Sequence, residues 1–259
     1  MASVPQDSVK ARICIISDTH SATPFPADLK HRAYRYPLPK ADVLIHAGDL
    51  TFQGELAEHE KMVEVLKGAD AELKIVIGGN HDISLDSVYI SNLPGIKGAD
   101  RRPYLRRYNI YTAEEMAVIK DLYCGDEALQ HGIRYLEEGV QTFTLRNGAK
   151  FTIYSSPWTP EHGLLAWTYP KQVDRYSPSS PSSKFQAPNP VPLFPEIDIM
   201  ITHGPPHGIL DYSLRGNLNA GCVHLMRAVE RCRPRIHCFG HIHGTSSVNT
   251  SQSVLLNPN

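Results

Sequence analysis

The sequence predicts an α/β fold with a largely parallel sheet, and three observations lead to this expectation. Short β-branched apolar runs recur along the 259 residues, each followed by turn residues, which is typical of buried strands. Segments with apolar side chains three and four residues apart lie between several of these runs, as in amphipathic helices. Hydrophobic residues make up 41% and charged residues 20% of the chain, which favours a globular domain over a disordered one. Strands that alternate with helices are typical of an α/β architecture.

Five runs are expected to be core strands because they are brief, apolar and β-branched. In chain order they are residues 13–16, 43–45, 75–77, 197–201 and 236–239. A sixth run, residues 151–154, alternates more between apolar and polar side chains, so we expect it to be antiparallel or to lie on an edge.

Four segments are expected to be helical. Residues 54–67 carry buried-type side chains at helical spacing. Thr112 and Glu115 have the spacing of a capping box, which predicts a helix that begins after Thr112. Residues 127–136 are expected to continue as a second helical piece, and residues 219–233 to form a further helix that a proline stops.

Charge and hydropathy exclude several classes of protein. Lysine and arginine number 26 and aspartate and glutamate 27, so the formal net charge is −1. A general nucleic-acid or membrane-surface binder would need a basic excess. No apolar run approaches the roughly 18 residues of a membrane span, and the first residues lack the pattern of a signal peptide. The chain is therefore expected to be cytoplasmic.

The segment of residues 177–195 breaks the composition of the chain, with six prolines and five serines. Such a segment is neither a central strand nor a helix interior. We expect a long surface loop within one domain that spans residues 1–259, because strand-like sequence resumes at residue 197. An active-site lid and an insertion without fixed structure are the two alternatives for it.

Polar side chains follow all five expected core strands. They are Asp18 and His20; Asp49; Asn80, His81 and Asp82; His203; and His241 and His243. In open α/β sheets ligands bind beyond the carboxyl ends of the strands, so we expect these side chains to converge at one edge. Neighbouring glycines let the backbone turn sharply and let a ligand approach closely.

These residue types suit divalent metal ions. Imidazole and carboxylate groups bind zinc, iron, manganese, cobalt or nickel, and no thiolate belongs to the set. Seven groups are too many for one tetrahedral ion, whereas a central aspartate suits two ions about 3.5–4 Å apart that share a carboxylate. Such a site performs in-line displacement at phosphorus. Each motif alone is weak, because Asp-x-His and Gly-Asp are mostly turn chemistry, but the ordered set is far stronger.

The ordered motifs resemble those of the calcineurin-like metallophosphoesterases, which are D-x-H, GD, GNHD or GNHE, a later H, and GHxH. All five are present in order, and the resemblance covers roughly residues 12–250. Residues 154–160 and 202–206 are similar to the MPPED branch, which includes small phosphodiesterases of animals and fungi. The resemblance implies a four-layer αββα fold, with two packed mixed β-sheets flanked by helices.

The resemblance also implies two metal ions, such as manganese, iron or zinc, held by seven residues. One ion would be held by Asp18, His20 and His243, the other by Asn80, His203 and His241, and Asp49 would bridge both. His81 would contact the phosphate and protonate or stabilise the leaving oxygen. Asp82 would orient His81 and stabilise its charge.

A few other residues give weaker functional signals. His207 and Trp158 are candidate substrate contacts, although packing is the stronger interpretation for Trp158. His46 lies within a strand and is expected to be a packed core histidine rather than a support for a metal ligand. The arginine cluster of residues 101–107 is expected to be a solvated face, with binding of a substrate phosphate or a nucleic-acid strand as the alternative.

The expected reaction is metal-dependent hydrolysis of a phosphate ester, with a metal-bridging hydroxide as nucleophile. The favoured substrate is a small phosphodiester such as a cyclic nucleotide, and no membrane or specific nucleic-acid partner is expected. A phosphomonoesterase or protein phosphatase is the alternative within this chemistry. A dinuclear hydrolase or lyase for a non-phosphate substrate, and a binding scaffold with weak catalysis, remain from other classes. The sequence does not specify the substrate, the metals or the oligomeric state.

Overall fold

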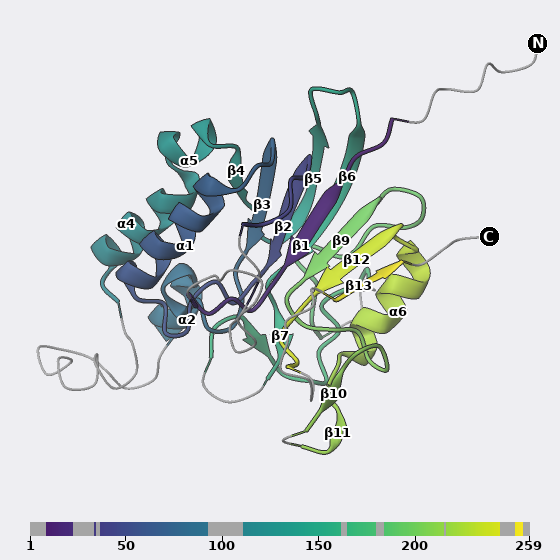
Figure 1. Cartoon of the computed structure of the whole chain (residues 1–259). Helices are drawn as coiled ribbons and strands as arrows, with labels where there is room; N and C mark the ends of the chain where they lie inside the picture. Colours follow the sequence, from purple (N-terminus) through teal and green to yellow (C-terminus); the bar gives the residue numbers. More distant parts are fainter. Residues whose placement is uncertain are drawn as a thin grey trace, which may run out of the picture.

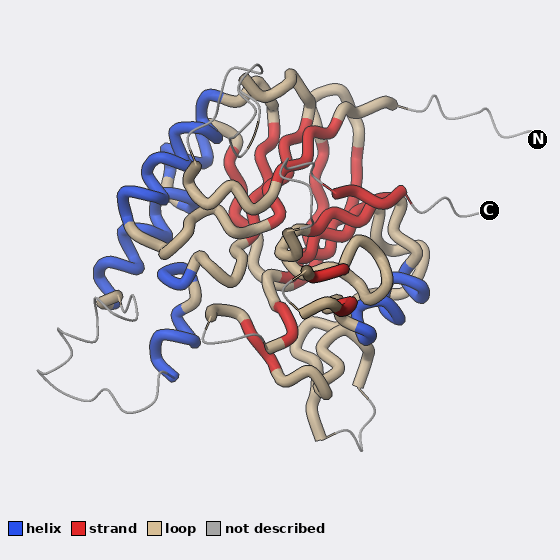
Figure 2. Tube along the Cα trace, turned by 60° about the horizontal axis from the view of Figure 1, so that its bottom comes forward, coloured by secondary structure: helices blue, strands red, loops and turns tan. Residues whose placement is uncertain are grey.

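Two β-sheets pack face to face, and helices cover their outer faces (Figures 1 and 2). The computed structural model describes residues 9–22, 34, 37–92, 111–161, 165–179, 184–214, 216–243 and 252–255. The order of layers is helix, sheet, sheet, helix, so the expected αββα fold is confirmed. No helix in these ranges is long and apolar enough to cross a membrane.

The first sheet has the order β1-β2-β3-β4, and its described strands are all parallel. They are β1 (Ile13–Ile16), β2 (Val43–Ala47), β3 (Leu73–Ile77) and β4 (Ile133–Tyr135). β2 and β3 are buried along their whole length, as expected for central parallel strands covered on both faces.

The second sheet is mixed and has the order β13-β12-β9-β6-β5. Its strands are β5 (Gly139–Thr144), β6 (Lys150–Ser156), β9 (Ile199–Thr202), β12 (Ile236–Phe239) and β13 (Gln252–Leu255). β6 is antiparallel to β5, as expected for the run at 151–154, but it is also parallel to β9 and therefore lies inside the sheet. Two short pairs complete the strands: β7 (Thr159–Pro160) with β8 (Thr168–Tyr169), and β10 (Tyr212–Ser213) with β11 (Leu218–Asn219).

Alternate residues of the central strands face opposite layers. Ile45 and Ile75 are fully buried between the two sheets, in one cluster with Ile153 of the second sheet. Leu44 and Val76 belong instead to the cluster beneath the helices. Each such side chain contributes about 1.5–3 kcal/mol through burial. The two-residue period of the strands therefore builds both cores at once.

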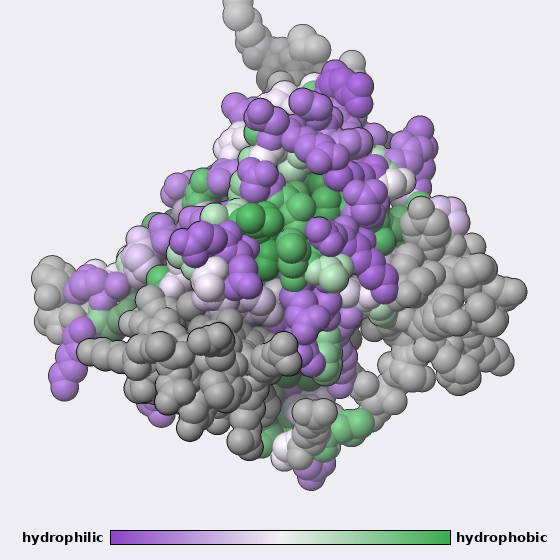
Figure 3. Space-filling view, turned by 90° about the vertical axis from the view of Figure 1, so that its left-hand side faces the viewer, coloured by the Kyte–Doolittle hydropathy of each residue, from purple (hydrophilic) through white to green (hydrophobic). Residues whose placement is uncertain are grey.

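Helices α1 (Leu56–Gly68), α4 (Ala113–Cys124) and α5 (Asp126–Gln130) cover the first sheet, next to the short η1 (Ile83–Leu85) and α2 (Ser87–Asn92). The predicted capping box of α4 is present, with the Thr112 hydroxyl and the Glu115 carboxylate each accepting the other's backbone N–H. The outward face of the helices that cover the first sheet carries an apolar patch among hydrophilic side chains (Figure 3). Helix α6 (Val223–Cys232) covers the second sheet through Leu225 and Val229.

Two predicted helices are shorter than expected. Within residues 127–136 only the part of α5 up to Gln130 is helical, because Gly132 adopts the left-handed region with φ of 76° and ends the helical run. Residues 133–135 then join the sheet as β4. The helix expected over residues 219–233 begins four residues later, since Asn219 pairs with Tyr212 in the β10–β11 hairpin.

The described part of the Pro/Ser-rich segment, residues 177–179 and 184–195, forms neither helix nor strand. Val191 is fully buried, and its backbone N–H bonds to the carbonyl of Tyr176 over 2.9 Å. Nearby, the buried Arg175 forms an ion pair of 2.8 Å with Glu138, whose carboxylate also accepts the Ser156 hydroxyl. This part of the segment is therefore packed onto the second sheet.

Candidate metal centre

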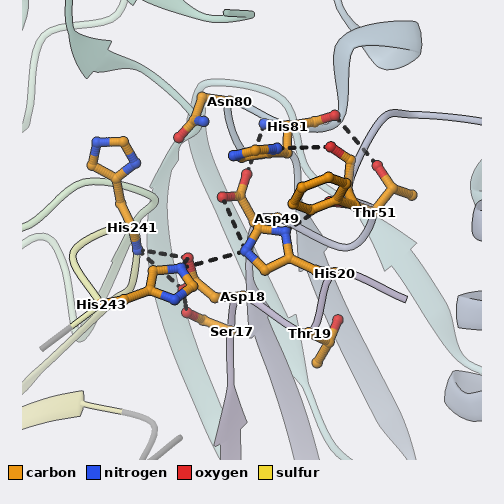
Figure 4. Close-up of polar contacts among 12 residues, drawn as sticks. Ser17, Asp18, Thr19, His20, Asp49, Thr51, Asn80, His81, His241 and His243 are labelled. Atoms are coloured by element: carbon orange, nitrogen blue, oxygen red, sulfur yellow. Dashed lines mark hydrogen bonds and ion pairs between the residues drawn. The ribbon is translucent and has the colours of Figure 1, made fainter. Parts of the chain in front are cut away.

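The predicted ligands gather beyond the carboxyl ends of five strands. β1 leads to Asp18 and His20, β2 to Asp49, β3 to Asn80 and His81, β9 to His203, and β12 to His241 and His243. Figure 4 shows side chains from these loops directed toward one another. Among the described residues, three overlapping groups of His and Asp have ligand atoms within 4.8 Å of one another.

The first group consists of Asp18, His20 and His243. The Nε2 atom of His243 lies 3.2 Å from Asp18 Oδ1 and 3.4 Å from His20 Nε2. The Nδ1 atom of His20 donates to the carbonyl of Thr51 over 3.0 Å. Because that carbonyl takes the Nδ1 proton, the neutral ring directs the lone pair of Nε2 into the group.

The second group consists of Asp49, His203 and His241, with Asn80 beside it. The Nε2 atom of His203 lies 3.3 Å from Asp49 Oδ1 and 2.9 Å from Asn80 Oδ1. Its Nδ1 atom donates to the Ala47 carbonyl over 2.9 Å, so the lone pair of Nε2 again faces the group. The His241 ring lies at 5.1 Å from the His203 ring, centroid to centroid.

Asp49 belongs to the second group and also faces His20 of the first group. Its Oδ1 atom faces His203, and its Oδ2 atom lies 3.9 Å from Nε2 of His20. The side chain is buried, and its Oδ1 atom also accepts the backbone N–H of His81 over 2.8 Å. One carboxylate therefore presents an oxygen to each group, as a bridging ligand does.

These residues fit metal ions by the chemistry of their donor atoms. In both groups, lone pairs of imidazole nitrogens face carboxylate or amide oxygens, which are themselves acceptors. Acceptor atoms face one another only when a proton or another cation lies between them. Imidazole and carboxylate are ligands of zinc, iron and manganese, so Asp18, Asp49 and the histidines could hold such ions.

Electrostatics in the metal-free chain agree with this interpretation. Burial alone would lower the pKa of His203, but the nearby Asp49 carboxylate outweighs it and raises that pKa to about 9. Burial alone would raise the pKa of Asp49, but His203 and His20 hold it well below its usual range. The field of the site thus favours a positive charge at its centre.

The backbone is strained where it presents the ligands. Asp18, His20, Asp49 and His241 all have positive φ, at 52°, 46°, 54° and 72°. Residues other than glycine rarely adopt this region, and such strain is typical of functional sites. At Gly79, a Cβ atom would collide with Asp49, so the approach of the two loops requires glycine.

His81 lies at the edge of the site, half-buried. Its Nδ1 atom donates to the carbonyl of Phe52 over 2.7 Å, and its ring makes an edge contact with His20 at 4.8 Å between centroids. It also belongs to one of the three ligand groups, with His20 and Asp49. A main-chain carbonyl therefore fixes the orientation of this imidazole.

The expected role of Asp82 in orienting His81 needs correction. The buried Asp82 carboxylate accepts the Thr51 N–H and hydroxyl, both over 2.8 Å, the Gly79 N–H over 2.8 Å and the Leu50 N–H over 3.1 Å. These four bonds tie the loop after β2 to the loop after β3. Burial, with the charge of Asp49 added, raises the pKa of Asp82 to about 7.

The two candidate substrate contacts lie outside the ligand groups. His207 is half-exposed, and its Nδ1 atom lies 3.4 Å from Asp211 of the same loop. Trp158 has the Arg175 guanidinium over its ring at 3.9 Å, so one ring face is covered. Contact of either residue with substrate stays a prediction. The arginine cluster at 101–107 lies outside the described residues.

His46 is fully buried, and its Nε2 atom lies 2.8 Å from the hydroxyl of Thr19, as expected for a packed core histidine. Sequence reasoning missed Phe52 and the carbonyls of Ala47 and Thr51. A carbonyl exists at every residue and gives no signal in the sequence. Phe52 did give one, since it is an aromatic residue three positions after Asp49 in a loop beyond a strand.

Comparisons with known proteins agree with the geometry. The model of the calcineurin-like phosphoesterase family matches residues 11–245. The chain is 33% identical over 247 residues to metallophosphoesterase domain-containing protein 1 of Homo sapiens, which covers 93% of this chain and 64% of that protein. It is 32% identical over 235 residues to a probable rhamnogalacturonate lyase C of Emericella nidulans, 90% of this chain and 17% of that protein. A UPF0046 protein of Caenorhabditis elegans is 27% identical over 246 residues, with 93% and 72% covered.

The chain thus spans less than two thirds of the length of the human relative. The matched family segment nevertheless includes all nine predicted catalytic and metal-binding residues, from Asp18 to His243. The family match, the order of the motifs and the αββα layers lead to one conclusion. The chain belongs to the calcineurin-like phosphoesterase family.

Proposed function

We propose that this chain hydrolyses phosphate esters with two bound metal ions, and that small phosphodiesters, including cyclic nucleotides, are its substrates. The position of Asp49 carries the proposal. Its two carboxylate oxygens face His203 in one ligand group and His20 in the other. A carboxylate shared in this way is the usual bridge of a dinuclear phosphoesterase site.

The residues divide into two ligand sets. Asp18, His20 and His243 would hold one ion, and Asn80, His203 and His241 the other. When bound, the ions supply positive charge to the phosphate oxygens and make a water molecule acidic near neutral pH. The Thr51 and Ala47 carbonyls accept the Nδ1 protons of His20 and His203, so Nε2 is the ring atom that each histidine would present to an ion.

His81 is proposed to act on the leaving oxygen. The Phe52 carbonyl keeps a proton on its Nδ1 atom, so a second proton, on Nε2, is the one available for transfer. The backbone N–H of His81 donates to Asp49, which fixes the ring beside the shared carboxylate. A positioned imidazole of this kind typically contributes 10²–10⁴-fold to the rate.

The charge around the site favours a diester over a monoester. Within the described ranges, no lysine or arginine bonds to the side chains of Asp18, Asp49, Asn80 or His81. Such a cation, beside the metal ions, would further stabilise a monoester dianion. A diester carries a single negative charge, and the ligand sets suit it without a further clamp.

Metal content and hydrolysis test the proposal together. The protein is purified without a metal-affinity tag, its metals are counted by plasma mass spectrometry, and bis-p-nitrophenyl phosphate is supplied with and without Mn²⁺. About two ions per chain with metal-dependent turnover support the proposal. The monoester p-nitrophenyl phosphate is supplied in parallel. Turnover of this monoester without turnover of the diester would make the chain a monoesterase. Bound metal without turnover of either ester would favour a non-phosphate substrate, and no bound metal a binding scaffold.

A further inference from the structure

Phe52 is an exposed aromatic residue at the edge of the metal centre. Its side chain is 55% exposed, although the loop that carries it follows directly after Asp49 and Thr51. The ring is stacked on His81, with centroids 5.4 Å apart and planes at 25°. It meets the ring of His20 edge-on at 5.8 Å. Phe52 therefore touches both a metal-ligand residue and the residue proposed to act on the leaving oxygen.

The loop that carries Phe52 is held firmly in place. The carboxylate of Glu58 accepts the backbone N–H groups of Phe52, Gln53 and Glu55 over 2.9–3.0 Å. The Tyr111 hydroxyl donates to the Gln53 carbonyl over 2.9 Å. The carbonyl of Phe52 in turn holds His81. The backbone that carries the ring is thus fixed before any ligand arrives, which reduces the entropy lost on binding.

An exposed apolar side chain by itself is ordinary. Phe52 differs because His81 contacts one face of its ring and solvent reaches the rest. A phosphate at the metal centre with its leaving oxygen at His81 would direct the attached group across Phe52. A flat apolar surface at that point favours a flat partner, since aromatic rings gain more from stacking than aliphatic groups do.

We propose that Phe52 is a specificity-determining residue of this site, and that its ring stacks on a nucleobase or aryl group of the ester. The inference rests on the proposed function for the position of the phosphate. It adds the chemical class of the group attached to that phosphate. The main-chain carbonyl of Phe52 and its bond to His81 do not depend on the side chain, so substitution separates the two roles.

Equilibrium binding tests the inference without relying on turnover. Adenosine 5′-monophosphate and inorganic phosphate are titrated by calorimetry into the metal-loaded protein. Phe52→Ala is expected to weaken binding of the nucleotide about tenfold, in the range of one stacked base, and to change phosphate binding by less than twofold. Phe52→Tyr, which keeps an aromatic ring, is expected to bind the nucleotide as the parent does. Phe194→Ala is the control, because Phe194 is similarly exposed, at 52%.

Equal weakening of nucleotide and phosphate, or no weakening of either, would overturn the inference. So would parent protein that binds the nucleotide no more tightly than phosphate. A second arm compares hydrolysis of 2′,3′-cyclic AMP, bis-p-nitrophenyl phosphate and glycerol 1,2-cyclic phosphate, which carries neither a base nor an aryl group. Phe52→Ala is expected to raise KM for the first two esters more than for the third, relative to the parent. If KM rises only for 2′,3′-cyclic AMP, the base is the group that stacks on Phe52. If KM rises only for bis-p-nitrophenyl phosphate, the aryl group is.

Failure of the proposed function is visible separately. If the parent protein hydrolyses none of the three esters, the proposed function is wrong, and the ratio of nucleotide to phosphate binding still decides whether Phe52 stacks. If the parent hydrolyses all three esters and Phe52→Ala changes KM equally for all three, the function stands and the inference is wrong.

Discussion

Main-chain carbonyls orient three of the histidines in the site. Thr51 holds His20, Ala47 holds His203 and Phe52 holds His81, each through the Nδ1 atom. Side-chain substitution at these three positions would leave the carbonyls in place. At the scale of single residues, the orientation of these histidines therefore depends on the shape of the loops, rather than on the side chains at these three positions.

His81→Ala is expected to keep both metal ions and lose most turnover. The imidazole lies at the edge of the ligand groups, and a positioned acid of this kind contributes about 10²–10⁴-fold. The measurements are kcat with bis-p-nitrophenyl phosphate and metal content. His131→Ala, at an exposed histidine, serves as the control. Turnover equal to the parent would remove His81 from the mechanism.

Asp49→Ala is expected to lose bound metal rather than only turnover. Its two oxygens serve both ligand groups, so its removal weakens both at once. The number of ions per chain, measured after dialysis, is expected to fall well below that of the parent. An exposed carboxylate, Asp126, gives the matched control as Asp126→Ala. Retention of two ions would contradict the bridging position of Asp49.

At the scale of elements, the site depends on how the loops after β2 and β3 are joined. Asp82 accepts four hydrogen bonds from Leu50, Thr51 and Gly79 in these loops. It lies next to His81 in sequence but serves the scaffold. The close approach at Gly79 and the positive φ of Asp49 depend on the same junction.

Asp82→Ala is therefore expected to lower both stability and metal affinity. Its buried donors would lose their acceptor, and each unsatisfied group costs about 1–3 kcal/mol. We expect the free energy of unfolding in urea to decrease by on the order of 3–5 kcal/mol, as it does when other buried polar networks are broken. Asp198→Ala is the comparison, since Asp198 is less buried and accepts the Thr152 N–H. Similar losses in the two variants would argue against the junction.

The strands were predictable because their signal is local. Residues 13–16, 43–45 and 75–77 are rich in β-branched apolar side chains, and they coincide with β1, the start of β2 and the end of β3. Ligand positions followed from the rule that strand ends converge. The short β4 was missed because three residues carry little pattern, and Gly132 before it is the one local signal of a break.

The hydrogen-bond partners of the Asp82 carboxylate and of the Phe52 carbonyl could not be predicted for a different reason. Both depend on which backbone groups of another loop lie opposite, and sequence spacing does not contain that information. Asp82 was assigned to His81 because the two are adjacent, whereas folding turns the carboxylate toward Thr51 and Gly79. The carbonyl of Phe52 takes its place at His81.

At the scale of the whole molecule, three buried histidines make stability depend on pH. Burial lowers the pKa of His46, His59 and His237 to about 3. The unfolded chain binds protons at these groups near pH 6.5, and the folded chain does not. Their contribution to stability is therefore complete above pH 6.5 and is lost as the pH falls from there toward 3.

Each such histidine is expected to lower the free energy of unfolding by about 1.4 kcal/mol as the pH falls from about 7.5 to about 5.5. His59 offers the test, since it lies away from the ligand groups and bonds to Tyr123 and Ser84. As the pH falls across this range, the free energy of unfolding of His59→Gln, measured in urea, is expected to decrease by about 1.4 kcal/mol less than that of the parent. An unchanged pH slope would mean that His59 is protonated in the folded chain.

The ligands are also spread along the whole chain, and this has a consequence for biosynthesis. Asp18 and His243 meet although 225 residues separate them in sequence. The first and the second ligand group each combine residues that follow the first sheet with residues that follow the second. A chain still emerging from the ribosome would hold neither group complete until β12 and the residues after it had been translated. The two groups could then take up metal ions only after the residues that follow β12 have joined the fold.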